Sequence, residues 1–220
     1  MSGDDGGAID ETGTALRFAS SERVKAFTDA VVAIAMTLLI LPLLDTIGEA
    51  ATENQTTLEW LQQNSGSLFV FVLSFVIIAN FWTSHHRLFA RVEHVSEGLL
   101  WITIAWMLTI VWLPVATSMT GQMESDALQR TLYIGSMAIT SILLFSARLY
   151  LRRHPQLHDI RASDLRRGLV ADVATAIMFV VSLAVAVIFP TVGYAALFLM
   201  FLVGPLHTLG MRIIGDPRPE

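Results

Sequence analysis

The sequence predicts an all-α membrane protein with six transmembrane helices per subunit. Hydrophobic residues make up 54% of the chain, charged residues make up 15%, and the mean hydropathy is +0.59. Soluble domains average about 45–50% apolar and about 25% charged residues. Six apolar runs are long enough to cross a hydrocarbon core of about 30 Å. They cover residues 24–44, 68–89, 99–118, 128–150, 168–189 and 191–209.

The two ends of the chain are polar and short. Residues 1–22 are rich in glycine and acids and have no hydrophobic centre, so we expect a disordered cytoplasmic N-terminus rather than a signal peptide. The membrane domain is expected over residues 23–210, followed by a short cytoplasmic tail at 211–220. Cysteine is absent, which excludes disulfides, thiolate metal sites and thiol redox chemistry.

Basic residues gather in alternate connections between the expected spans. They precede the first span and follow the second, fourth and last spans, with Arg130 as the exception. The loop of residues 45–67, on the opposite side, carries acids and no base. Because basic residues accumulate on the cytoplasmic side, both termini are expected in the cytoplasm. The basic connection at 148–167 could also contact anionic lipid headgroups, although membrane topology alone accounts for it.

The first apolar run contains a carboxylate and a regular aliphatic stripe. Asp29 lies inside the run, where a charge is costly unless it has a partner or a polar cavity. Beyond it, Ile34, Leu38 and Leu41 recur at the spacing of one helical face. Val32 lies off this stripe and is expected to face lipid. A neighbouring face, on which helices could approach closely, consists of small residues: Ala26, Ala30, Ala33 and Thr37.

Three motifs lie along the first three expected spans: Arg23, Phe27, Thr28 and Asp29, then FWTSHHRLF at 81–89 and WLPVATSMTG at 112–121. Together they resemble the transmembrane protein 175 family of potassium channels. Residues Arg23, Phe27, Thr28 and Asp29 are similar to the family's arginine-x-x-x-Phe-Ser-Asp signature, with threonine in place of serine. The strings FWTSHHRLF at 81–89 and WLPVATSMTG at 112–121 resemble the ends of its second and third helices. Pro42 stands where many bacterial members carry an acid, and it is expected to bend the outer end of the helix.

The resemblance implies a homotetramer in a bacterial inner (plasma) membrane, with the first helices lining a central pore. It places Ile34 at the narrowest ring and Leu38 and Leu41 in the next layers outward. Such a hydrophobic constriction would pass potassium, modestly preferred over sodium and other monovalent cations. Thr37 could offer its hydroxyl to the pore, or bond a carbonyl of its own helix. Membrane lipids and other copies of the chain are the expected partners; no cofactor or nucleic acid is expected.

The polar residues of the first two spans suggest an interhelix network. Arg23 and Asp29 are six residues apart and do not share a helix face, so each needs partners elsewhere. Trp82, His85 and His86 lie at the same expected depth and could join the two helices. Alternatively, the histidines and Arg87 are interfacial residues that touch headgroups. Adjacent histidines point about 100° apart, which argues against a metal site.

Other readings of the sequence have less support. The string TVGYA at 191–195 differs by one residue from a potassium-channel filter, but it leaves no room for a pore helix and suits a turn at Pro190 and Gly193. Asp172 is expected to pair with Arg166 or Arg167, or to serve a helix N-terminus. An enzyme is not expected, because no nucleophile–base pair or phosphate loop is present. A proton-permeable protein or an ion-coupled secondary transporter remains the alternative function.

Overall fold

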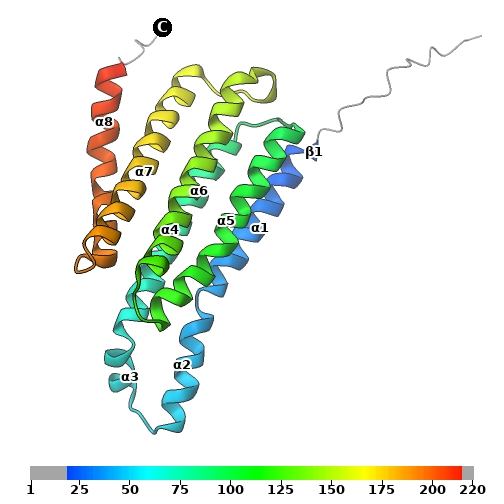
Figure 1. The fold of residues 1–220 in the computed structure, drawn as a ribbon. Coiled ribbons are helices and arrows are strands. Elements are labelled where there is room, and N and C mark those ends of the chain that lie inside the picture. Colours follow the sequence, from blue (N-terminus) through cyan, green and yellow to red (C-terminus); the bar gives the residue numbers. More distant parts are fainter. Residues whose placement is uncertain (1–18, 215–220) are drawn as a thin grey trace, which may run out of the picture.

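The computed structural model describes residues 19–214 and shows an elongated bundle of helices (Figure 1). Five helical segments are long and apolar enough to cross a membrane, which confirms five of the six expected spans. Apart from its helices, the described part contains two short antiparallel strands, β1 (Ala19–Ser20) and β2 (His94–Val95). The five spans are α1 with its continuation α2 (Ser21–Leu38 and Leu41–Thr52), α4 (Ser65–Phe89), α5 (Glu97–Gln122), α6 (Ala127–Arg153) and α7 (Ala162–Ile188).

The first span is interrupted near its end by Pro42. Helix α1 ends at Leu38, and α2 begins at Leu41 with the proline in its first turn. Proline has no backbone N–H, so it cannot donate to the carbonyl of Leu38 and continue the α1 hydrogen-bond ladder. The expected bend is thus confirmed, and Leu41 belongs to α2 rather than to the first helix itself.

The expected polar loop of residues 45–67 is largely helical. Helix α2 runs on to Thr52, and the short helix α3 (Thr57–Gln63) contains the LEWLQQ string. Thr56 and Glu59 form a capping box at the start of α3, and hydrogen bonds from the backbone N–H and hydroxyl of Thr56 lower the pKa of Glu59. Trp60 Nε1 donates to Thr46 Oγ1 at 3.2 Å, which joins α3 to α2.

The sixth expected span does not form one regular α-helix. A 3-10 segment, η2 (Gly193–Leu202), is followed by α8 (Val203–Ile214), and neither is among the five candidate spans. Both pack against α7, and α8 lies beside it at the edge of the bundle in Figure 1. Gly193 starts η2 with a φ of 51°, and Tyr194 donates to Gln129 Oε1 at 3.0 Å. The TVGYA string is therefore part of a turn and a helix, not an extended filter.

The chain ends differ from the expected domain limits where the structure describes them. The expected disordered N-terminus falls mainly on residues 1–18, which lie outside the described residues. Ala19 and Ser20 form β1, however, and α1 already begins at Ser21. Helix α8 extends past residue 210, to Ile214.

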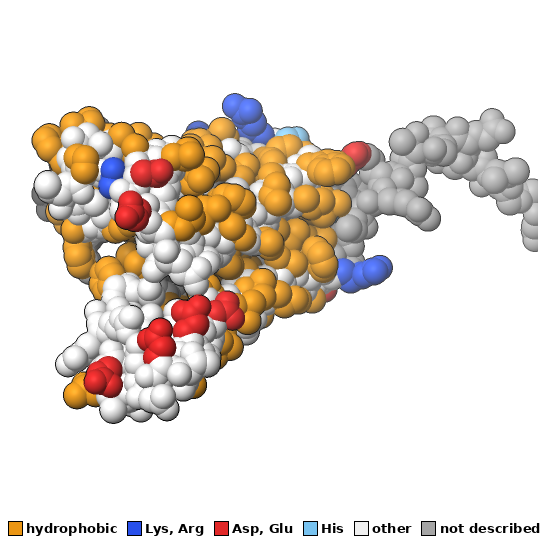
Figure 2. All heavy atoms as spheres, turned by 60° about the horizontal axis from the view of Figure 1, so that its bottom comes forward, with side chains coloured by type: hydrophobic (Ala, Val, Ile, Leu, Met, Phe, Trp, Pro, Cys, Tyr) orange, Lys and Arg blue, Asp and Glu red, His pale blue; other side chains and the backbone are white. Residues whose placement is uncertain are grey.

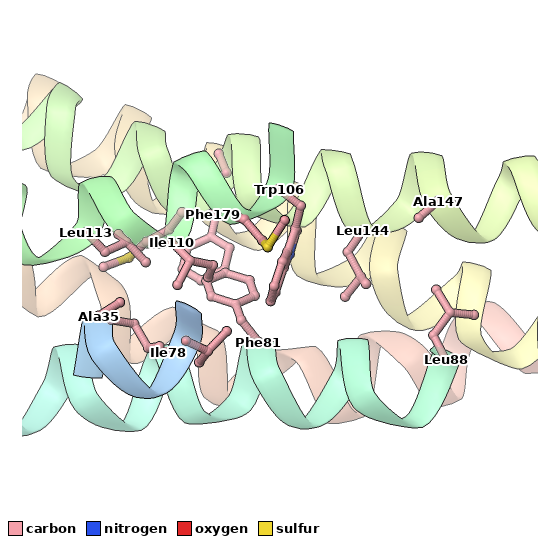
Figure 3. Close-up of a cluster of buried hydrophobic side chains, with 14 of the residues drawn as sticks. Ala35, Ile78, Phe81, Leu88, Trp106, Ile110, Leu113, Leu144, Ala147 and Phe179 are labelled. Carbon is pink, nitrogen blue, oxygen red and sulfur yellow. The ribbon is translucent and has the colours of Figure 1, made fainter. Parts of the chain in front are cut away.

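Apolar side chains from α1, α4, α5, α6 and α7 fill the core. Figure 3 shows Trp106 of α5 and Phe179 of α7 near Phe81 and Ile78 of α4, and all four are buried. Hydroxyl groups add a second link between the helices. Tyr133 and Ser74 share a hydrogen bond of 2.7 Å, and Thr117 donates to Ser74 Oγ at 2.8 Å. Such polar contacts between membrane helices supplement close packing.

Asp172 is buried and pairs with Arg148, a residue other than the two expected partners, Arg166 and Arg167. Arg148 Nε lies 2.6 Å from Asp172 Oδ2, and this ion pair joins α6 to α7. Gly168 makes room for the pair, because a Cβ built there would collide with the Arg148 guanidinium.

We expect Gly168→Ala to destabilise the protein by about 1–3 kcal/mol, because the displaced guanidinium would leave Asp172 buried without its partner. Gly135→Ala is a matched control in α6, where a new Cβ would meet only ordinary contacts at 3.9 Å. Thermal unfolding in detergent should show a lower midpoint for Gly168→Ala alone. Equal midpoints for the two variants would contradict this role of Gly168.

Candidate permeation path

Helix α1 packs one face against the protomer and leaves the other uncovered. Thr28, Val32 and Ala35 are at most 1% exposed, and α1 packs mainly on α5 and α4. Val32 was expected to face lipid, and this expectation is wrong: it lies on the packed face. The apolar first span gave no sign of which apolar residues neighbouring helices would cover.

The aliphatic stripe lies on the uncovered side of the first span. Ile34 is 60% exposed, Leu38 is 38% exposed, and Leu41, at the start of α2, is 49% exposed. Apolar side chains cover much of the visible surface of the long helices in Figure 2. An uncovered stripe on a membrane helix is available to lipid, to another copy of the chain or to a pore.

Small residues line the same uncovered side. The exposed members are the four that the sequence placed on one face: Ala26, Ala30, Ala33 and Thr37. The Thr37 hydroxyl donates to the carbonyl of Ile34 at 2.7 Å, which is one of the two alternatives for this side chain. Its oxygen keeps lone pairs that can accept a further bond.

Asp29 links the first two spans. Trp82 Nε1 of α4 donates to Asp29 Oδ1 at 2.8 Å, and His86 Nδ1 lies 4.0 Å from the same oxygen. The rings of Trp82 and His86 are 5.3 Å apart. Since these two residues are one helical turn apart on α4, both reach a single carboxylate. The arrangement fixes the position of α1 relative to α4 at this depth.

The other signature residues do not join this cluster. The Arg23 and Phe27 side chains are exposed, and no hydrogen bond or ion pair of Arg23 occurs among the described residues. Thr28 is buried and donates to the carbonyl of Val24 at 2.8 Å. His85 points into the core, where its ring stacks between Phe89 and Trp106 at 4.1 and 4.3 Å. The structure therefore groups Asp29 with Trp82 and His86 and separates Arg23, Phe27 and His85 from them.

Acidic side chains lie at the end of the bundle that α2 and α3 form. Figure 2 shows several of them on the projecting lobe, where four acids are exposed: Asp45, Glu49, Glu53 and Glu59. A cavity of about 440 Å³ lies between this lobe and the ends of α4 and α5, with Asp45 and Glu49 in its lining. The acids were visible in the sequence, but the cavity depends on α2 continuing the first span as a helix beside the ends of α4 and α5.

A second, more apolar cavity lies away from α1. It has a volume of about 410 Å³ and is lined by α4, α6, α7 and η2, with Asp172 and Asn80 among its polar residues. None of its lining residues belongs to α1. The described residues contain no group of three histidines, cysteines or carboxylates that could hold a metal ion.

Residues 23–114 match the family model described as the endosomal/lysosomal potassium channel TMEM175. This segment of the chain is therefore similar to the TMEM175 family. This segment contains α1, the Asp29–Trp82 contact and most of α5. The family that this segment matches is one of channels, not of enzymes.

Several curated proteins are similar to part of this chain. A potassium channel of Streptomyces collinus is 32% identical over 106 residues, 46% of this chain and 48% of that protein. A potassium channel of Chryseobacterium sp. is 28% identical over 99 residues, 45% of this chain and 48% of that protein. The endosomal/lysosomal proton channel TMEM175 of Danio rerio is 26% identical over 136 residues, 62% of this chain and 26% of that protein.

The fold is similar to that of one solved structure. The crystal structure of a lysosomal potassium-selective channel TMEM175 homolog from Chamaesiphon minutus superposes with a TM-score of 0.60 at 17% identity. The match covers 88% of this chain and 96% of the other. The chain spans about half the length of the curated bacterial relatives that it matches. The family model matches residues 23–114, which lie within the first three spans.

Proposed function

We propose that this chain is one subunit of a tetrameric cation channel whose first helices line a central path and that prefers potassium modestly over sodium. The observation that carries the proposal is the uncovered stripe of Ile34, Leu38 and Leu41, opposite a fully packed face of the same span. The stripe lies within the segment that matches the family, and bacterial relatives are named potassium channels.

Ile34 forms the narrowest ring in this proposal, with Leu38 and Leu41 as wider layers outward. Aliphatic side chains give a cation no oxygen ligands, so an ion passes partly dehydrated or when the constriction is transiently wetted. Potassium holds its hydration water less tightly than sodium, which favours potassium at such a constriction. Thr37, one turn beyond Ile34, supplies hydroxyl oxygens beside the path.

The polar signature residues hold this assembly together. Asp29 fixes α1 against α4 through Trp82 within one subunit. The exposed Arg23 and the small residues of α1 are available for contacts with the neighbouring subunit. Closed rotational symmetry is the general solution for such identical interfaces.

We propose six spans, with η2 and α8 together as the sixth. Two consecutive segments covering residues 193–214 pack along α7, and six spans keep the basic connections on one side. Both termini are then cytoplasmic in a bacterial inner membrane. The acidic lobe of α2 and α3 lies at the outer mouth, where its negative charge would concentrate cations.

Proton conduction is the second candidate function. Vertebrate relatives are named proton channels, including those of Danio rerio and Mus musculus. A wetted constriction could carry protons along the same path as potassium. An ion-coupled transporter lacks a comparable relative among the proteins reported above.

The reversal potential of purified protein in liposomes tests ion preference. With potassium and sodium gradients opposed, we expect a reversal potential displaced from zero toward the potassium equilibrium potential. A proton gradient applied alone distinguishes proton conduction from potassium conduction, because only a proton-conducting protein would then show a shifted reversal potential. Absence of any conductance in correctly assembled protein would contradict both.

A further inference from the structure

Three segments meet at the end of the bundle that carries β1, and we call them the clasp: residues 19–21, 91–95 and 157–160. Strand β1 pairs with β2, with Ala19 opposite Val95. Ser21 Oγ donates to the carbonyl of Val92 at 2.5 Å, within a buried contact. The first turn of α1 is thereby fastened to the connection between α4 and α5.

The third segment of the clasp is fastened to the same connection. Val92 and His158 form an antiparallel bridge. On either side, the Glu93 N–H donates to the carbonyl of Leu157 at 2.9 Å, and the Asp159 N–H donates to the carbonyl of Arg91 at 3.0 Å. The clasp therefore joins the start of α1, through residues 91–95, to the connection between α6 and α7.

Both ring nitrogens of His158 are used inside the clasp. The backbone N–H of Ile160 donates to His158 Nδ1 at 2.9 Å, and His158 Nε2 lies 3.1 Å from the carbonyl of Leu151. A backbone N–H can only donate, so Nδ1 must be unprotonated, and a carbonyl can only accept, so Nε2 must carry the hydrogen. This geometry admits the neutral imidazole in one tautomer.

We propose that the clasp is a proton-sensitive switch that opens when His158 is protonated. Imidazole side chains change charge between about pH 5 and 8. Protonation would place a hydrogen on His158 Nδ1, which faces the backbone N–H of Ile160. Two hydrogen-bond donors would then face each other, and the hydrogen bond between Ile160 and His158 would be lost. The clasp is therefore complete at neutral pH and weakens as the pH falls, releasing residues 157–160 and then the Val92 anchor of α1.

Among the described residues, no carboxylate contacts His158 and could stabilise its protonated form. Arg91 of the clasp instead pairs with Asp164 at 3.3 Å. The charged and titratable groups on the elements packed around His158 are mixed in sign: Arg91, Glu93, His94, Arg152, Arg153, His154, Asp159, Arg161 and Asp164.

His154 is a matched control in the same connection. Its Nδ1 lies 2.9 Å from the carbonyl of Tyr150, and its ring stacks on Tyr150 at 4.1 Å. A carbonyl accepts, so this contact needs a protonated Nδ1 and is compatible with the charged imidazole. Protonation of His154 thus leaves its hydrogen bond in place.

Amide hydrogen exchange of the full-length protein, at about pH 7.5 and about pH 5.5 and corrected for intrinsic rates, tests the proposal. Protection of the Glu93, Asp159 and Ile160 amides should fall by about two- to ten-fold at the lower pH, the equivalent of one lost hydrogen bond. The Leu68 amide, at the opposite end of the bundle, is the internal reference within the wild-type protein.

Two variants complete the experiment. In His158→Asn the side-chain oxygen can accept from Ile160 at any pH, so protection should become independent of pH, whereas His154→Asn should behave like the wild type. Unchanged protection in the wild type, or an equal loss in His158→Asn, would overturn the switch. The experiment measures hydrogen exchange rather than ion flux. The switch proposal can therefore fail while the channel proposal stands, and the channel proposal can fail while the switch proposal stands.

Discussion

Replacing Ile34 by asparagine is expected to raise ion conductance and to reduce the preference for potassium over sodium. An amide at the narrowest ring offers hydrogen bonds to water, so a hydrated ion no longer needs to shed its shell there. Since each 1.4 kcal/mol of lost barrier corresponds to a ten-fold change in rate, we expect an increase of about ten-fold. Single-channel or liposome flux recordings would measure both quantities.

Ile139→Asn is the matched control for this substitution. Ile139 lies on α6 and is 53% exposed, close to the 60% of Ile34, but it is not on the first span. The control should leave conductance and ion preference unchanged, although it places the same polar group on an exposed membrane helix. If Ile34→Asn also left both unchanged in assembled protein, Ile34 would not form the constriction.

Asp29→Ala is expected to destabilise the protomer and its assembly by about 1–3 kcal/mol. The substitution leaves the part-buried donor Trp82 Nε1 without the carboxylate oxygen that accepts its hydrogen bond at 2.8 Å. Asp29→Asn retains an oxygen at this position and should lose less. Thermal unfolding and native mass spectrometry in mild detergent would report stability and the fraction of tetramer.

Arg23→Ala should separate assembly from protomer stability. Arg23 has an exposed side chain and no hydrogen bond or ion pair among the described residues of the protomer, so its loss should lower the tetramer fraction without a comparable change in the unfolding midpoint. Asp29 and Arg23 variants that remained tetrameric but changed only ion preference would place these residues in the permeation path instead.

Much of the helical layout could be predicted because membrane spans have a strong local signal. Apolar length located five spans, although the first runs on to Thr52 and the fifth already begins at Ala162, and Pro42 located the break between α1 and α2. The i, i+4, i+7 spacing placed Ile34, Leu38 and Leu41 on one side of the first span. It could not decide whether that side or the opposite one would be covered.

Partners between helices could not be predicted from spacing. Asp172 pairs with Arg148, 24 residues earlier, because α6 and α7 lie antiparallel and Gly168 leaves room for the guanidinium. His85 and His86 are adjacent in sequence, yet one enters the core and the other reaches toward Asp29. Both outcomes depend on which helices become neighbours, which is a property of the whole bundle.

The central claim is that α1 lines a central pore. The sequence contains no cysteine, so an introduced cysteine supplies the only thiol in each subunit and permits a direct test. In Ile34→Cys, four converging thiolates would bind Cd²⁺, a soft metal ion that favours sulfur ligands. We predict that micromolar Cd²⁺ blocks potassium flux through Ile34→Cys and that a chelator restores it, with no block of the wild type or of Ile139→Cys. Conducting Ile34→Cys protein that Cd²⁺ leaves unblocked would contradict a central pore lined by α1.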